Sequence, residues 1–315
     1  MQSPTFQTWA AKQAAQRISD AIGAKVEIRK VKIRFFDRAL IEGFYVEDLH
    51  KDTMLYIDKI EANFDDVYLN ASHFDFDHVK LSDGQFNIRQ FWNEDDLNIQ
   101  FILDILDPPR KPGDTSHSVP PELFFWKAEL ENIDFTYEYR DSIPDTVFGM
   151  NYDHLKFTNI NARIDRFLII NDSLSGEIRN LRCRESSGFE LQDFKSDFIV
   201  SYNTMEFANL KANTPKSELN GKVRFDYSSY GDLTEFIDSV QIRSKIRSSK
   251  VNLDELAVFS KELKGLDLDL NLAGNIKGTV GNLRGRNMTI EFGKQSRMLG
   301  NFHFIGLPDT DSLYY

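Results

Sequence analysis

The residues best suited to chemistry in this 315-residue chain lie in the segment HFDFDH, which begins at His73. Strand alternation would place His73, Asp75 and Asp77 on one face, where imidazole and carboxylate groups are able to ligate a metal ion. The same alternation has a simpler interpretation, a solvated strand face opposite Phe74 and Phe76. Acids alternate with apolar residues elsewhere in the chain without any histidine, so we favour the structural interpretation and predict no metal site.

Other signatures of catalysis are weak or missing in the sequence. Cys183 lies between Arg182 and Arg184, but in a strand both arginines point to the face opposite the thiol. The sequence contains no G-x-S-x-G elbow, no phosphate-binding GxxxxGK[ST] loop and no HExxH pair. The chain is therefore predicted not to be an enzyme and to use no cofactor.

Composition and charge narrow the class of protein. Apolar residues make up 41% and charged residues 28% of the chain, which is typical of a folded protein. The formal net charge of -11 argues against nucleic acid or anionic headgroups as the main partner, because both require clustered basic charge. The lone cysteine excludes an internal disulfide. The 26 phenylalanines favour pleated, half-buried surfaces and therefore β-structure.

The first domain predicted from the sequence is an amphipathic helix over residues 1–24 that caps a sheet. Ser3 and Pro4 are typical of a helix start, and Gly23 is typical of a helix end. Apolar residues recur between them at helical spacing, which gives the helix one apolar stripe.

The second predicted domain is a repeating β-groove over residues 25–315. Short helices are expected near 97–106, 231–238 and 254–264, where apolar residues follow the helical period. Five prolines fall in the stretch 107–121, which predicts a surface loop within the domain.

From Val26 onwards the hydrophobic period changes to two, which predicts about a dozen strands with one apolar and one polar face. We therefore expect a mainly β fold, an elongated and curled antiparallel sheet whose apolar face forms a groove. A sheet folded over an ordinary filled core fits the same periodicity and remains open. The residues predicted to line the groove are Ile60, Phe64, Phe74, Phe76, Phe86, Ile88, Ile133, Phe135, Tyr137, Ile160, Ile164, Phe198, Val200, Val223, Phe225, Leu266, Leu268, Leu270, Leu272, Ile290, Phe292, Phe302 and Phe304.

A short internal repeat accompanies the strands. The pattern apolar-x-Asn-apolar occurs around Asn132, Asn159, Asn180, Asn209 and Asn282, and the first four copies are 27, 21 and 29 residues apart. Asparagine tolerates the left-handed backbone conformation, so the repeat predicts a recurring bulge or turn. Repeats of this length are typical of arrays in which each unit is covered by its neighbours.

Several short motifs follow one another in a specific order. They are QTWA at 7–10, GAKV at 23–26, RFF at 34–36, GFYVED at 43–48, DTMLY at 52–56, LNIQFILD at 97–104, GNF at 300–302 and GLPD at 306–309. With these motifs the chain resembles the N-terminal part of the TamB proteins, which belong to the AsmA-like group of diderm bacterial envelopes.

The resemblance implies a β-groove that spans the periplasm, similar in architecture to the eukaryotic bridge-like lipid transfer proteins. It implies phospholipid acyl chains as ligands, transport between the inner and outer membrane, and a role in outer-membrane biogenesis. It also implies an inner-membrane anchor before Ser3 and a C-terminal region that meets an Omp85-type outer-membrane protein. Neither segment is present in this sequence, so we expect it to be a piece of a longer protein.

Two other functions remain open on the sequence alone. The first is a scaffold or chaperone that holds outer-membrane polypeptides by strand addition during translocation and assembly. The second, with less support, is a β-solenoid hydrolase acting on polysaccharide. A hydrolase requires paired acids on adjacent turns, and the one-sided Phe-rich strands do not supply them.

Overall fold

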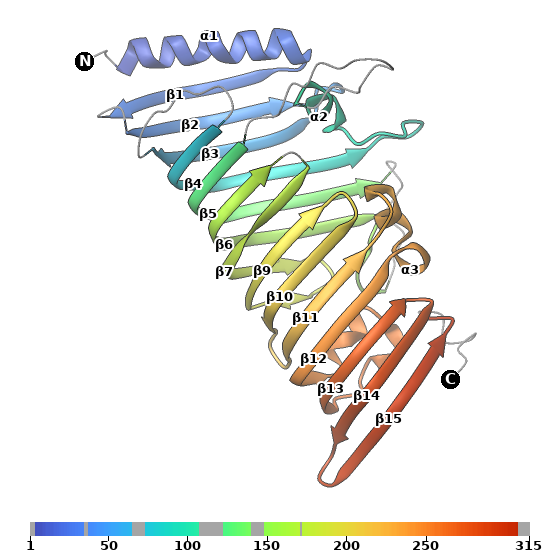
Figure 1. Ribbon diagram of the computed structural model, residues 1–315. Helices are drawn as coiled ribbons and strands as arrows, with labels where there is room; N and C mark the ends of the chain where they lie inside the picture. The colour runs from blue at the N-terminus through green and yellow to red at the C-terminus, as the bar shows by residue number, and fades with distance from the viewer. Residues whose placement is uncertain are drawn as a thin grey trace. The chain divides into compact units, whose positions relative to one another are not determined.

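Strands account for 64% of the chain in the computed structural model (Figure 1), which confirms the predicted mainly β fold. The 15 strands belong to one sheet in which neighbours follow the order of the chain, with β8 paired to β7 beside the main path. The predicted loop at 107–121 lies outside the described residues. The structure describes residues 4–34, 37–64, 73–106, 122–139, 148–170 and 172–307.

The chain divides into two compact units, which are described separately. Unit 1 comprises residues 1–171 and 183–186, and unit 2 comprises residues 172–182 and 187–315. The elements of unit 1 are α1 (Pro4–Ile22), β1 (Val26–Arg34), β2 (Arg38–Glu47), β3 (Thr53–Asn63), β4 (His73–Gln90), α2 (Gln100–Leu106), β5 (Glu122–Tyr139) and β6 (His154–Ile170). Most of β7 (Ser173–Glu185) belongs to unit 2, with β8 (Glu190–Leu191), β9 (Asp193–Ser201), β10 (Thr204–Asn213), β11 (Glu218–Asp226), η1 (Tyr230–Glu235), α3 (Phe236–Ser239), β12 (Gln241–Asn252), η2 (Glu255–Val258), η3 (Lys261–Leu263), β13 (Asp269–Thr279), β14 (Asn282–Phe292) and β15 (Ser296–Ile305).

The sheet is mixed, whereas the sequence predicted an antiparallel one. Strands β4 and β5 run parallel over their whole length, and the other pairs with a described register are antiparallel. The connection between Gln90 and Glu122 includes α2 and is long enough for the crossover that a parallel pair requires.

Helix α1 lies along the outer edge of β1 (Figure 1). The Gln7 side-chain amide donates to the Ile33 carbonyl (3.2 Å) and accepts from its amide (2.9 Å). The Thr8 hydroxyl makes the same pair of bonds with the backbone of Val31, at 3.1 and 3.2 Å. An unpaired strand edge is a template for aggregation, and α1 satisfies the backbone groups that would otherwise be open at these residues.

The repeated asparagines are bulge residues at three of their five positions. Asn132, Asn159 and Asn209 have φ values of 53°, 53° and 52°, and the strand register shifts beside each of them. Asn180 and Asn282 do not adopt a positive φ, and Asn282 instead follows the turn between β13 and β14, where it pairs with Thr279. The short pattern therefore marks the left-handed position in only part of the array.

A line of left-handed residues crosses unit 1 and changes which residues face the same side. Gly43, Asp83 and Asn132 occupy matching positions on β2, β4 and β5, with φ values of 64°, 54° and 53°. In β4, apolar side chains stand at the even positions Phe74 and Phe76, at the odd positions Val79 and Leu81, and at even positions again from Phe86 onwards. The first change falls in the row of Arg166, whose φ is 51°, and the second in the row of Asp83. One face thus stays apolar along a strand of 18 residues that the sequence divided into two shorter strands.

The segment 254–264 is not the α-helix predicted from its sequence but the two 3₁₀ helices η2 and η3. Side-chain hydrogen bonds compete with a regular helix there. The Asp254 carboxylate accepts from the Gly265 amide (2.8 Å), and the Glu255 carboxylate accepts from the Lys216 amide (2.7 Å). The strand predicted over 266–272 begins only at Asp269.

Candidate functional site

Unit 1 presents a continuous apolar face built from strand β1 to strand β6. Residues in register on neighbouring strands point to the same face, so a row of paired side chains crosses the sheet. Near one end of the strands this row consists of Val46, Leu55, Phe86, Phe135 and Phe157. Near the other end it consists of Phe64, Phe76, Phe125 and Phe167, whose successive ring centroids are 5.1, 4.9 and 5.6 Å apart.

Between the two aromatic rows the face carries aliphatic side chains. Ile41, Ile60, Leu81, Leu130 and Ala162 are paired in register from β2 to β6. No charged residue interrupts this row. The face therefore offers an apolar surface that extends both across and along the strands.

Helices cover only part of this face. Ala15 of α1, Val26, Val46 and Met54 form a buried cluster, and Phe101 and Ile102 of α2 pack against it. Phe76, Phe125 and Phe135 are only partly buried. Among the described residues, Val240 is the one large side chain that is completely buried. Much of the apolar face is thus reachable from solvent, as a binding surface requires and a filled core does not allow.

Unit 2 continues the apolar alternation on its own strands with smaller residues among the large ones. Phe207, Val223, Ser244, Ile276, Gly285 and Phe302 are paired in register from β10 to β15. A neighbouring row contains Met205, Phe225, Ile242, Gly278, Leu283 and Phe304. Glycine and serine thus alternate with aromatic and aliphatic side chains on this face.

The predicted lining residues lie in strands with three exceptions. Phe64 directly follows β3 and contacts Phe76, whereas Leu266 and Leu268 precede β13 and are 48% and 38% exposed. The prediction missed members of the same rows, among them Phe44, Val46, Leu55, Phe125, Phe167, Met205 and Phe207. Strict alternation overlooks such residues, because at left-handed positions such as Gly43 the apolar side chains change between odd and even residue numbers. A glycine or asparagine inside an otherwise apolar strand is the sequence signal that could have indicated these left-handed positions.

The opposite face of unit 1 carries alternating charges. Ion pairs join Lys30 to Glu42 (3.3 Å) and Lys127 to Glu129 (2.7 Å). Burial raises the pKa of the Glu129 carboxyl, whereas the hydrogen bonds from Lys127 and His78 lower it. Together the lowering effects are larger, so the pKa lies below its ordinary value. This face therefore differs from the apolar one by its rows of ion pairs, although Phe124 also lies on it, in register with Asp75.

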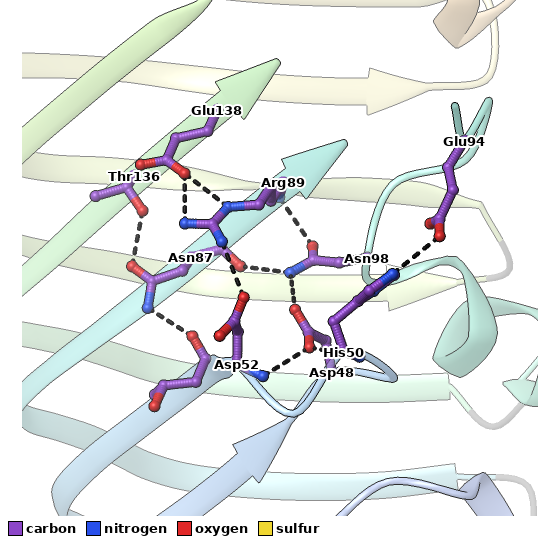
Figure 2. Close-up of polar contacts among 10 residues, drawn as sticks. Asp48, His50, Asp52, Asn87, Arg89, Glu94, Asn98, Thr136 and Glu138 are labelled. Atoms are coloured by element: carbon purple, nitrogen blue, oxygen red, sulfur yellow. Dashed lines mark hydrogen bonds and ion pairs between the residues drawn. The ribbon is translucent and has the colours of Figure 1, made fainter. Parts of the chain in front are cut away.

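A polar network fastens the segment before α2 to the ends of β3 and β4 (Figure 2). Asp48 is 2% exposed, and its carboxylate accepts from the amides of His50 and Asp52 (2.9 Å each) and from the Asn98 side chain (3.0 Å). Asn98 in turn accepts from the Arg89 amide at 2.9 Å. Asp48 and Asn98 form the buried pair at the centre of this network, and each of their side-chain polar atoms has a hydrogen-bond partner. We therefore assign the network a structural role.

The structure separates the apolar from the acidic residues in the motif that first suggested chemistry. Phe74 and Phe76 pair with Leu123 and Phe125 on the apolar face, and Asp75 pairs with Phe124 on the other face. Within the described residues, no group of three or more His, Cys, Asp and Glu side chains could hold a metal ion. Burial raises the pKa of the Cys183 thiol, so a smaller fraction of it is in the reactive thiolate form.

No family model, curated protein or solved structure matches this chain. In the described part of the chain, no helix has both the length and the apolar character needed to cross a membrane.

Proposed function

We propose that the apolar face of this sheet shields the acyl chains of phospholipids from water. In this proposal the chain is the membrane-proximal part of a periplasm-spanning envelope protein, which moves phospholipid between the inner and outer membrane and supports outer-membrane biogenesis. The supporting observation is the pair of aromatic rows in unit 1, which are partly exposed and joined by aliphatic side chains. Each buried methylene of a ligand contributes about 0.8 kcal/mol, so an extended apolar face favours long chains.

The proposal is tested by adding one carboxylate to either face of the same strand. Leu272 and Asn271 are neighbours on β13, and they pair with Ile290 on the apolar face and Glu291 on the polar face. Leu272→Asp should remove lipid that co-purifies with the protein, because acyl chains offer the carboxylate no partner. Asn271→Asp adds the same charge opposite Lys250 and should leave the lipid in place.

Lipid is measured by native mass spectrometry and folding by circular dichroism, on wild type and both variants. Folded Leu272→Asp protein without lipid supports the proposal. Folded protein with unchanged lipid contradicts it. Unfolding of Leu272→Asp alone would indicate a packed core and would contradict an open lipid-binding face.

The last strand supports a second candidate function, a scaffold for unfolded outer-membrane polypeptides. Within the described residues β15 pairs with β14 alone, and Met298 and Leu299 are 57% and 66% exposed on its two faces. Exposed apolar side chains on both faces of a strand favour contact with an added apolar strand. Leu299→Lys should abolish binding of a synthetic strand-forming peptide without changing the lipid content, whereas unchanged peptide binding would contradict the scaffold.

A further inference from the structure

A row of basic side chains crosses the polar face of unit 2. Arg243, Lys277, Arg284 and His303 are paired in register on β12, β13, β14 and β15. On the next row along, Asn275 is paired with Arg286. Like charges directly opposite each other destabilise a sheet. The chain as a whole carries a net charge of -11, so this cluster also runs against the overall charge of the protein.

Within the described residues, the central members of the cluster have no carboxylate partner. Arg243 contacts Asp226 (3.2 Å), but Lys277, Arg284 and Arg286 form no ion pair. The other ends of the same strands differ. There, Lys250 is paired with Asp269 (2.7 Å) and Arg297 with Glu291 (3.3 Å). A surface that served only solubility would mix both signs in the same way along the strands.

Two hollows adjoin the unpaired cations. The first has a volume of about 470 Å³ and is lined by Gln241, Asn275, Lys277, Thr279, Asn282 and Arg284 together with Arg286. The second, of about 590 Å³, is lined by Arg284, Arg286, Asn287, Asn301 and His303. Arg284 and Arg286 line both, and neither hollow contains a carboxylate. The side chains supply ammonium, guanidinium and amide groups.

Polar neighbours flank the cluster. The His303 Nε2 atom lies 2.6 Å from the Asn282 Oδ1 atom, to which it donates, and 3.5 Å from the Arg284 Nε atom. Arg284 lines both hollows. Guanidinium groups bind phosphate oxygens in a bidentate manner, and a lysine adds a compact point charge.

We propose that these hollows form a binding site for a phosphate-bearing ligand with two or more negative charges. Three cations without counter-ions around a hollow of this size match such a ligand in charge. The volume lies within the ~300–1,000 Å³ that is typical of small-molecule sites. A free phosphate compound and a phospholipid headgroup share this chemistry. The proposal does not depend on the apolar face, because it concerns the other side of the strands.

The test compares two double variants that remove the same net charge from unit 2. Lys277→Gln with Arg284→Gln alters the proposed site, and Lys250→Gln with Arg297→Gln removes the ion-paired cations at the other strand ends. Binding of inorganic pyrophosphate is measured by calorimetry and by thermal unfolding at constant ionic strength. We expect the site variant to bind about tenfold more weakly or worse, because charge-assisted hydrogen bonds are lost. The control should bind like wild type.

The stability of the free proteins provides an independent readout. Removal of like-charge repulsion should leave the ligand-free site variant at least as stable as wild type, whereas the control loses two ion pairs. A site variant that unfolds more easily than the control would contradict the assignment. So would equal pyrophosphate affinity in all three proteins, or no affinity in wild type.

A second arm distinguishes the sources of phosphate. Flotation is performed with vesicles of phosphatidylglycerol and of phosphatidylcholine. Binding to the anionic vesicles that is lost in the site variant but kept in the control supports a headgroup. Pyrophosphate binding without vesicle binding supports a free phosphate compound. Vesicle binding that is equal in all three proteins, without pyrophosphate binding, would overturn the site.

Discussion

The apolar faces of the two units use different residues for the same alternation. In unit 1, Leu55, Phe86, Phe135 and Phe157 follow one another on successive strands, so every strand contributes a large side chain. In unit 2, glycine stands at Gly278 and Gly285 in rows that otherwise contain Ile, Leu and Phe. The comparison shows that an apolar face can be continuous either by contact between large side chains or by overlap onto glycine.

Overlap onto glycine has a direct geometric signature in unit 2. A Cβ atom added at Gly285 would lie 2.5 and 2.7 Å from ring atoms of Phe302 and 3.0 Å from the Met288 side chain. The Phe302 ring therefore lies across the glycine of the neighbouring strand, as occurs where aromatics cover glycines in sheets. In unit 1 the corresponding contacts join ring to ring, for example Phe86 to Phe135 at 6.0 Å. The two apolar layers are therefore built by different contacts, ring to ring in unit 1 and ring over glycine in unit 2.

The largest expected effect concerns glycine overlap in unit 2. At Gly274 the backbone has a φ of 147°, and an added Cβ would meet Met288, with its Cα at 2.9 Å, and the Asn287 carbonyl at 3.1 Å. Gly274→Ala should lower the free energy of unfolding by about 2–4 kcal/mol, since the neighbouring strand has to move. Gly300 lies two strands away on the same face with nothing within 4 Å of an added Cβ. Gly300→Ala is the control, and equal losses in urea denaturation would refute the overlap.

A size-matched pair of substitutions tests the contrast between the units. Ile60 is flanked in register by Ile41 and Leu81, whereas Ile276 is flanked by Ser244 and Gly285. Ile60→Ala should destabilise by about 2 kcal/mol and Ile276→Ala by about 1 kcal/mol, because fewer apolar contacts are lost at the second position. The measurement is urea denaturation of both variants, and the reverse order would show that the faces are covered differently from this account.

The sequence predicted the fold class and most of the large residues of this face, because strand alternation reports directly which side chains are buried. It could not predict the left-handed backbone at Asp83, after which the apolar side chains of β4 change from odd to even positions. It also could not predict the parallel pairing of β4 and β5, since that depends on where the crossover returns the chain. The prediction of a helix over 254–264 was wrong because the Glu255 carboxylate accepts a hydrogen bond from the Lys216 amide. This contact joins segments that are distant in the sequence, so the local pattern does not report it.

The polar sites were the least predictable part of the molecule. The row formed by Arg243, Lys277, Arg284 and His303 comes from four separate strands. None of these residues belongs to a sequence motif, and only the register brings them together. The opposite happened around Asp75 and Asp77, where a suggestive motif gave no metal-binding cluster among the described residues. Periodicity within a strand is local information, whereas a binding site on a sheet depends on the pairing of strands.

A further feature of unit 1 is the edge of β1, which α1 covers with side-chain hydrogen bonds. Thr8→Val removes the hydroxyl that pairs with the amide and carbonyl of Val31 while it keeps the shape of the side chain. We expect a loss of about 1–2 kcal/mol, because backbone groups at a part-buried edge lose their partner. Thr8→Ser is the control, since it retains the hydroxyl. The variant should also dimerise more readily in analytical ultracentrifugation, and an unchanged free energy of unfolding would show that the bonds to α1 are dispensable.

The smallest expected effect is the pH dependence that comes from exposed carboxylates in the two units. The hydrogen bond from Lys250, followed by that from Asn252, holds the pKa of Asp269 in unit 2 below its ordinary value. In unit 1 the hydrogen bond from Arg29 does the same for the pKa of Asp58. A depressed folded-state pKa contributes stability above the unfolded-state pKa of about 3.9, and this contribution is lost as the pH falls through the folded-state value.

Asp269→Asn and Asp58→Asn should therefore be less stable than wild type at pH 7, and the difference should shrink as the pH is lowered below about 4. Free energies of unfolding between pH 3 and pH 7 provide the measurement. Both carboxylates are exposed to solvent, so salt should reduce the difference at pH 7, because the screening length falls to about 3 Å at 1 M. Asn252 is 2% exposed and bonds to both Asp267 (3.0 Å) and Asp269 (2.9 Å), which holds the unit 2 carboxylate in a fixed network. We therefore expect the salt-resistant part of the effect to be larger for Asp269 than for Asp58, and equal salt sensitivity at the two sites would show that the network adds nothing to a simple surface ion pair.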